Sequence, residues 1–404
     1  MRTLLFWVLV AIVAGALLGL VLPSWAIVPF ATFNDVFGKF LSFCVPLIIV
    51  GLVAPALADL GAGAGKWLLI TVGIAYGSTL FAGFGTYAVC RGIFPTLLAS
   101  EKVSELSEPK NAVASILGDQ FDIPQMFSVM SALIFAFVLG ITMAALNPRI
   151  IRRGFDEFRD IIMLLIKKAI VPCLPLYIFG TFLNMSYSGE IAKVISAMIK
   201  VIVVSILLTF VLLLIQYLLA GAIAKRNPFT ALGNMMRAYF TALGTSSSAA
   251  TIPVTYQCTL SNGVSPDIAG FTVPLCATIH LAGSMTKITA FSMAVLFMTG
   301  GNYDIGAYAL FIVMLGITMV AAPGVPGGAI TAAQGVLVGL LGFTDPMYSL
   351  MVALYIAIDS VGTATNVTGD GAIALVVDRL AAGSLGKERA HSMEAAEDIL
   401  SGTD

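Results

Sequence analysis

The stretch Asp359-Ser-Val-Gly-Thr-Ala-Thr-Asn-Val-Thr-Gly-Asp370 places two carboxylates and an amide in a chain that is 59% hydrophobic. On a helix, the spacing i, i+4, i+7 and i+11 forms one polar stripe from Asp359, Thr363, Asn366 and Asp370. The surrounding segment, about residues 346–380, is otherwise apolar. A charged side chain within a membrane span costs about 2.5 kcal/mol or more and usually faces a cavity or the protein interior. The stripe therefore predicts a functional site, and a structural pair that holds helices together is the alternative.

Composition defines the class of the protein. The chain has 404 residues, of which 11% are charged, and its mean hydropathy is +0.99, which is typical of polytopic membrane proteins. The 21 Lys and Arg are balanced by 22 Asp and Glu, so no basic patch favours nucleic acid. The five cysteines lie in apolar segments without metal-ligand spacing and are interpreted as small core residues. No resident cofactor is expected.

The first half of the chain is predicted to contain six membrane spans, because each apolar segment approaches the ~20 residues that a span needs. These segments are residues 4–22, 37–57, 67–89, 126–146, 160–182 and 191–224, with a polar excursion over 94–125. The first segment lacks a clear small-residue cleavage site, so we interpret it as a retained helix rather than a signal peptide. Basic residues occur at alternate loops, which places both termini in the cytoplasm.

The second half contains two apolar segments that are interrupted by turn residues. Residues 229–244 and about 254–260 flank Gly244-Thr-Ser-Ser-Ser-Ala-Ala-Thr-Ile-Pro253, and residues 305–322 and 329–342 flank Pro323-Gly-Val-Pro-Gly-Gly328. Paired interrupted segments indicate a transporter site near the bilayer midplane. With a span over 268–298 and the stripe helix, they predict an all-α polytopic membrane protein with eight transmembrane helices and two re-entrant helical hairpins. Proline and glycine kinks in ordinary full spans are the alternative.

Four motifs resemble the dicarboxylate/amino acid:cation symporter family, which includes glutamate and neutral amino acid transporters. They are Ser246-Ser-Ser-Ala-Ala-Thr-Ile-Pro-Val-Thr255, Val273-Pro-Leu-Cys-Ala-Thr-Ile279, Gly324-Val-Pro-Gly-Gly328 and Asn366-Val-Thr-Gly-Asp370. The resemblance covers about residues 225–380 specifically, and a serine/threonine-type subgroup is one placement within it. It implies an inverted-repeat fold similar to glutamate transporters, a homotrimer, and an elevator movement in which the hairpin tips act as gates.

The resemblance also implies a division into domains. The scaffold comprises residues 1–66, with helices one and two, and 94–190, with the polar loop and helices four and five. The transport domain comprises helix three in 67–93 and residues 191–382, which contain helix six, both hairpins and helices seven and eight. The tail, residues 383–404, is expected to be a cytoplasmic helix or disordered.

Site residues are carried over from the resemblance by position. Asp359 matches the carboxylate that binds a substrate α-amino group, and Asn366 matches the amide near the substrate backbone. The full substrate set is Ser247, Ser248, Val325, Gly327, Asp359, Gly362, Thr363 and Asn366, with Pro326 also at the second hairpin tip. The sodium set is Cys276 through its backbone, Thr278, His280, Asn366 and Asp370.

Three departures from the family pattern bear on substrate and ion. Gly362 stands where acidic-substrate members carry an arginine, which favours a neutral substrate because guanidinium is what binds a side-chain carboxylate. His280-Leu-Ala282 replaces Asn-Met-Asp, and Ala282 has no side-chain ligand for a further sodium ion. The third departure is Lys287, seven residues after His280. Lys287 is a candidate coupling residue because it could replace a cation or pair with Asp359 or Asp370. His280 is a second candidate because it could carry a proton.

These observations predict a secondary active symporter in the plasma or inner membrane that couples cation entry, with sodium favoured, to uptake of serine, threonine or alanine. An acidic amino acid or C4-dicarboxylate symporter, with a proton as the coupling ion, is the first alternative. An anion channel is the second. An enzyme is not expected, because the chain has two histidines and lacks HExxH and GxSxG motifs.

Overall fold

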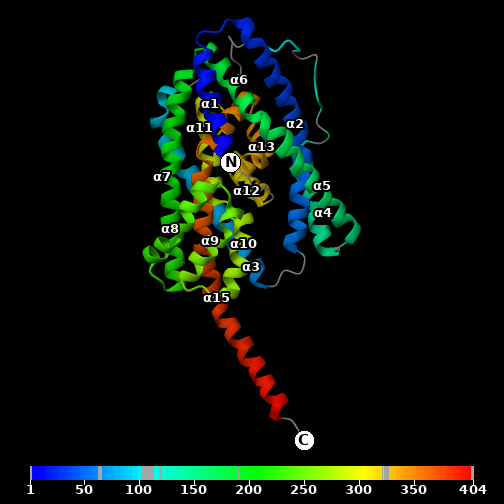
Figure 1. The fold of residues 1–404 in the computed structure, drawn as a ribbon, viewed down its shortest axis with the longest axis vertical. Coiled ribbons are helices and arrows are strands. Elements are labelled where there is room, and N and C mark those ends of the chain that lie inside the picture. Colours follow the sequence, from blue (N-terminus) through cyan, green and yellow to red (C-terminus); the bar gives the residue numbers. More distant parts are fainter. Residues whose placement is uncertain are drawn as a thin grey trace.

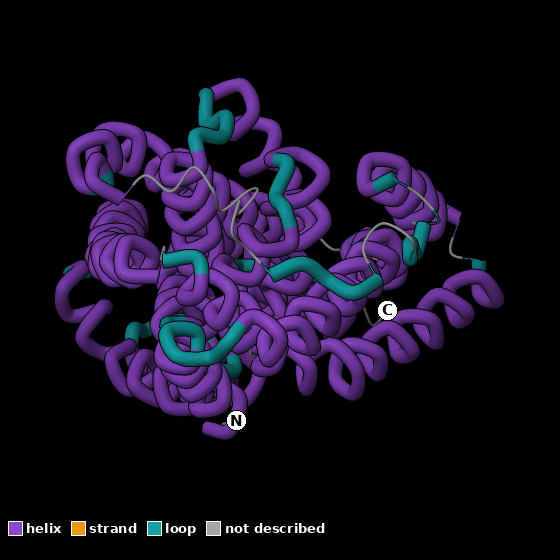
Figure 2. Tube along the Cα trace, turned by 90° about the horizontal axis from the view of Figure 1, so that it is seen from above, coloured by secondary structure: helices purple, strands orange, loops and turns teal. Residues whose placement is uncertain are grey.

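The protein forms an elongated bundle of helices in the computed structural model (Figure 1). The structure describes residues 2–61, 66–101, 113–117, 121–124, 126, 128–146, 148–189, 191–320, 322 and 327–401. Every regular element in these ranges is helical. Figure 2, viewed from above, shows the helices packed side by side and joined by loops. The all-α prediction is therefore confirmed.

A first group of helices comes mainly from the N-terminal half. It contains α1 (Arg2–Leu18), α2 (Ser24–Gly61), α4 (Val129–Leu146), α5 (Arg149–Leu165), the π-helical turn η3 (Ile166–Ile170) and α6 (Val171–Tyr187). α1 packs on α6, and α2 packs on α4, α5 and α6. Glycines let α1 and the turn after it approach α6 closely, since a Cβ at Gly15 would lie 2.7 Å from the Phe179 carbonyl oxygen and one at Gly19 would clash with the Leu183 carbonyl oxygen.

Two expected boundaries in this group are corrected. α2 begins at Ser24, so the loop expected before residue 37 is helical, and Pro29 lies inside the helix. Pro29 removes one backbone hydrogen bond inside the helix, and membrane-spanning helices tolerate this because neighbouring helices and side chains satisfy the freed carbonyl. The expected fifth span begins earlier than residue 160, because α5 continues through η3 into α6. This continuous segment contains residues 149–187.

A second group surrounds the stripe helix. It contains α3 (Lys66–Leu97), the short η1 (Ala99–Glu101), α7 (Ile191–Ala224) and the elements that follow α7. α7 has the bounds expected from the sequence. Glu101 accepts hydrogen bonds from Lys200 Nζ at 2.7 Å and Ser196 Oγ at 2.8 Å, both on α7. These bonds, that from Lys200 first, hold the pKa of Glu101 below its usual range.

Each interrupted segment forms a helical hairpin. α8 (Pro228–Thr245) packs against α9 (Ser248–Ser261), and α12 (Ile305–Val320) packs against α13 (Gly328–Leu341). The first break is shorter than expected: it consists of Ser246 and Ser247, with Pro253 inside α9. Most of the second tip, residues 323–326, lies outside the described residues.

Two further helices are broken at the level of the stripe. α10 (Pro266–Ile279) gives way to α11 (Ala282–Thr299) at His280 and Leu281. α14 (Asp345–Ala357) meets α15 (Asp359–Ser401) at a bend of 62° at Ile358. The single helix expected over residues 346–380 is therefore two helices, and Asp359 opens the second one. In Figure 1, α15 runs through the bundle and its last turns project beyond the other helices.

Helix length and hydropathy agree with a multi-pass membrane protein. Among the described residues, five helices are long and apolar enough to cross a membrane, or six if α14 and α15 count as one span. Shorter apolar helices include Phe6–Leu18 and Ile134–Leu146. The predicted number of eight spans is therefore not confirmed. Part of the polar excursion expected over 94–125 lies outside the described residues.

Candidate functional site

A small polar cavity lies where the breaks of the second group meet. Its volume is about 40 Å³. It is lined by Ser246, Ser248, Ala277, Thr278, Leu281, Ser284, Ala322, Ala329, Tyr355, Asp359, Thr363 and Asn366. These residues come from both hairpins, both halves of each broken helix, and the stripe. Non-helical backbone at membrane depth is tolerated where it lines such a cavity, and transporters place their sites at such breaks.

Asp359 connects the stripe to the second hairpin. It is the first residue of α15, and its side chain is 10% exposed. Its Oδ2 accepts a hydrogen bond from the Gly327 backbone N–H at 2.9 Å, just before α13 begins. Its Oδ1 lies 3.4 Å from Lys287 Nζ. The carboxylate therefore faces the cavity while it is held from two other sides.

Lys287 is fully buried on α11 and occupies the space above Gly362. A Cβ at Gly362 would lie 2.4 Å from Lys287 Nζ and 2.2 Å from its Cε. The ammonium also lies 3.8 Å from the centre of the Tyr355 ring. Of the two pairings expected for Lys287, the structure has the one with Asp359. Gly362 is buried beneath this lysine and is not among the described lining residues of the cavity.

The first hairpin tip contributes hydroxyl groups. Ser246 has φ 49° and ψ 32°, a left-handed conformation that ends α8. Ser247 caps α9, because its side chain accepts a hydrogen bond from the Ala250 N–H at 3.3 Å. Ser248, the first residue of α9, lines the cavity together with Ser246. The structure therefore places Ser248 at the cavity and Ser247 beside it in a capping position.

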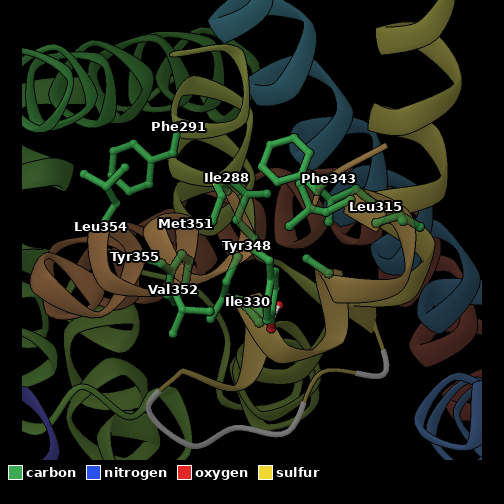
Figure 3. Close-up of a cluster of buried hydrophobic side chains, with 14 of the residues drawn as sticks. Ile288, Phe291, Leu315, Ile330, Phe343, Tyr348, Met351, Val352, Leu354 and Tyr355 are labelled. Carbon is green, nitrogen blue, oxygen red and sulfur yellow. Dashed lines mark hydrogen bonds between the residues drawn. The ribbon is translucent and has the colours of Figure 1, made fainter. Parts of the chain in front are cut away.

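Asn366 organises the start of α11. Its Oδ1 accepts hydrogen bonds from the backbone N–H groups of Gly283 and Ser284, at 2.8 and 3.3 Å. Its Nδ2 donates to Ser284 Oγ at 3.2 Å, and Tyr355 donates to the same oxygen at 3.0 Å. Figure 3 shows Tyr355 among apolar side chains, with Met351 and Val352 of α14 nearby. The network fixes three lining residues to one another.

Asp370 lies about one turn beyond Asn366 on α15, next to His280. His280 Nδ1 is 2.9 Å from Asp370 Oδ1, and both side chains are buried. On its other side, His280 Nε2 is 3.1 Å from Ser78 Oγ. Asp370 Oδ2 has no hydrogen-bond partner within the described part of the chain. One buried carboxylate oxygen thus remains available to a cation.

The other expected ion ligands lie around this position in different roles. The Cys276 carbonyl accepts the His280 backbone N–H at 2.9 Å at the end of α10. Thr278 lines the cavity, and its hydroxyl donates to the Leu275 carbonyl at 2.7 Å. Over the described ranges, no group of three or more His, Cys, Asp or Glu is arranged for a metal. A transition-metal centre therefore has no support there, and a hard cation would depend on carboxylate and carbonyl oxygens.

Some site residues could not be placed or were not predicted. Val325 and Pro326 lie outside the described residues, whereas Gly327 contacts Asp359 and Thr363 lines the cavity. Tyr355 and Ser284 line the cavity but were not predicted. Tyr355 precedes Asp359 by four residues, a spacing that could have added it to the stripe. Ser284 carried no signal, because a serine in an apolar helix is common.

Broken helices that converge on a small polar cavity define a secondary transporter among multi-pass membrane proteins. Residues 4–380 match the model of the Sodium:dicarboxylate symporter family, and the chain belongs to that family. Members are transporters rather than enzymes, and membership implies co-transport of a cation.

Named relatives cover the chain to different extents. A serine/threonine transporter SstT of Streptococcus suis (strain 05ZYH33) is 29% identical over 335 residues, which are 80% of this chain and 91% of that protein. SstT of Streptococcus thermophilus (strain CNRZ 1066) is 25% identical over 385 residues, 92% of this chain and 94% of the other. The rat excitatory amino acid transporter 1 is 28% identical over 288 residues, 70% of this chain, and the match spans about half (52%) of its length.

Proposed function

We propose that this protein is a sodium-coupled symporter for a small neutral amino acid such as serine, threonine or alanine. The observation that carries the proposal is the cavity itself. It holds about 40 Å³, its charged lining residue is Asp359, and no Lys or Arg belongs to its described lining. The single carboxylate in its lining suits a small zwitterion whose one amine pairs with it. The two SstT relatives, named for serine and threonine, support this choice.

The two ends of the cavity suit the two charges of an amino acid. Asp359 would accept hydrogen bonds from the substrate amine, which is worth about 1.5–3 kcal/mol for a charged pair. Ser248 begins α9, where backbone N–H groups and the helix dipole favour the substrate carboxylate, and Ser246 lies two residues before it. Thr363 and Asn366 lie between them on α15. The tip residue Val325 remains a prediction.

Sodium is the proposed coupling ion, as substrate rather than resident cofactor. Asp370 offers a buried oxygen without a hydrogen-bond partner among the described residues, and the Cys276 carbonyl lies at the end of the neighbouring broken helix. One sodium ion that moves down a tenfold gradient and ~100 mV releases about 3.7 kcal/mol, on the order of 500-fold accumulation of a neutral solute. A single ion is therefore sufficient for concentrative uptake.

We further propose an elevator mechanism in a homotrimer, located in the plasma or inner membrane with cytoplasmic termini. Every described lining residue of the cavity falls within 246–366, inside the predicted transport domain of 191–382. A site contained in one domain could move across the membrane with that domain. The helices α1, α2, α4, α5 and α6 pack mainly on one another, as a separate scaffold would.

Uptake of labelled L-serine into proteoliposomes tests the proposal. An inward sodium gradient should drive accumulation that excess L-threonine or L-alanine blocks and that L-aspartate or succinate does not. The Asp370→Asn variant should lose sodium dependence, while the matched control Asp378→Asn, on the same helix but bonded to Ser265, should retain it. Accumulation blocked by aspartate or succinate would favour the acidic substrate, and accumulation driven only by a proton gradient would reject sodium.

A channel is separated from a carrier by exchange. Proteoliposomes loaded with unlabelled L-serine should take up labelled L-serine faster than empty ones, with saturation, because a carrier site reorients with its cargo. Flux that is neither saturable nor stimulated by internal serine would support an anion channel instead.

A further inference from the structure

We propose that Lys287 is a tethered cation that permanently occupies a site for a small monovalent cation. Its ammonium is surrounded by the kind of ligands that bind such an ion. Nζ lies 3.3 Å from the Ile358 carbonyl, 3.4 Å from the Asp359 carbonyl and 3.4 Å from Asp359 Oδ1. The face of the Tyr355 ring closes the site at 3.8 Å from the ring centre.

The position of this site in the fold explains its ligands. Ile358 is the residue at which α14 and α15 bend by 62°, and its carbonyl oxygen accepts the backbone N–H groups of Val361 and Gly362 as well as the Lys287 ammonium. In transporters, carbonyls at broken helices coordinate the co-transported cations. The Lys287 side chain reaches this break from α11 and is 0% exposed. Its ammonium therefore takes the place of a cation in the protein interior.

Charge balance gives the tethered cation a role in transport. When no substrate amine is bound, Asp359 would be an unpaired buried carboxylate unless another cation lay nearby. Lys287 supplies that charge from the chain itself. Ala282 also offers no side-chain ligand for a further sodium ion. We therefore expect each transport cycle to use one free cation fewer than it would if Lys287 did not occupy its site. This consequence rests on the proposed symport, whereas cation binding by the site does not.

Gly362 leaves the space that the tip of the Lys287 side chain occupies. Any larger residue would place a Cβ 2.4 Å from the ammonium. The glycine therefore leaves the volume that the lysine tip fills, and truncation of Lys287 would open that volume to a free ion.

The test is a thermal-unfolding titration of the purified protein without amino acid. Lys287→Ala should gain a saturable rise in melting temperature with methylammonium chloride, and potassium or sodium chloride should show which alkali ion also fits. Choline chloride controls for ionic strength. The wild type and Lys200→Ala, which removes a partly exposed lysine from the Glu101 pair, should show no rise specific to methylammonium.

The outcomes separate this proposal from the symport proposal. A saturable shift in Lys287→Ala alone supports the tethered cation even if L-serine is not transported. An equal shift in the wild type overturns it, and so does folded Lys287→Ala that binds none of the cations. If Lys287→Ala folds poorly, recovery of monodisperse protein with methylammonium is the readout, and failure of every cation to rescue it overturns the proposal.

In transport assays, Lys287→Ala should show a steeper sodium dependence, with a higher Hill coefficient, because a further sodium ion enters the site that the lysine vacates. A merely structural lysine would lower the amount of active protein without changing that coefficient. If an active Lys287→Ala variant kept the wild-type Hill coefficient for sodium, a free sodium ion would not be replacing the Lys287 ammonium, and the proposal would be contradicted.

Discussion

Replacement of Asp359 by Asn removes the one charge that links the cavity, the second hairpin and Lys287. An asparagine can still accept the Gly327 N–H, so the hairpin contact is retained. The substrate amine loses a charged partner, which is worth about 1.5–3 kcal/mol, or about 10-fold to 150-fold in affinity. The amine also then lies near an ammonium without its counter-charge, so we expect the upper end of this range or a complete loss.

Stability should fall in the same variant for a separate reason. Lys287 is fully buried, and removal of one partner from a buried ion pair costs about 3–5 kcal/mol. The assay is equilibrium binding of labelled L-serine to purified protein, with thermal unfolding on the same sample. Asp378→Asn is the matched control, because it makes the same chemical change on the same helix. Wild-type affinity in folded Asp359→Asn would refute the assignment of Asp359 to the substrate amine.

Three further predictions concern the surroundings of the site. Gly362→Ala should weaken L-serine binding, because its Cβ displaces the Lys287 ammonium. The double variant Lys287→Ala/Gly362→Ala should lose no more affinity for L-serine than Lys287→Ala alone. Additive losses in a double-mutant cycle would contradict the shared space. The depressed pKa of Glu101 contributes stability that is present above its unfolded pKa of about 4.3 and is lost as pH falls below it, so melting temperatures should fall more from pH 5 to pH 3 in the wild type than in Glu101→Gln. Gly19→Ala should destabilise the α1–α6 contact by about 1–3 kcal/mol, while Gly77→Ala, which enters open space, should be nearly neutral; equal thermal stability of the two would refute the close approach.

Much of the helical order could be predicted from the sequence, because long apolar segments and turn residues have clear patterns. α7 has the predicted bounds, and both interrupted segments form hairpins. The bend at Ile358 could not be predicted, since Tyr355-Ile-Ala-Ile-Asp359 contains no proline or glycine. At this bend the Ile358 carbonyl accepts a hydrogen bond from the buried Lys287 ammonium, a tertiary contact that the local sequence does not reveal.

The candidate site was predictable in part. The helical spacing of the stripe correctly placed Asp359, Thr363 and Asn366 on one helix, and the cavity is lined by all three. Gly362 shares that spacing but lies beneath Lys287, which comes from a helix more than 70 residues earlier in the chain. A periodic pattern identifies the face of one helix and carries no information on which distant side chain covers it.

The hydrogen bond between Gly327 and Asp359 joins two equilibria, the position of the second hairpin and the occupancy of the carboxylate by an amine. Such coupling is reciprocal. A bound amine weakens the hydrogen bond from Gly327 to Asp359 by the same factor by which that hydrogen bond weakens the affinity for the amine. Ligands without an amine would leave the carboxylate to Gly327 and hold the tip closed. Inhibitors that differ only in that amine should therefore differ in how firmly Gly327 is held while they are bound, as well as in affinity.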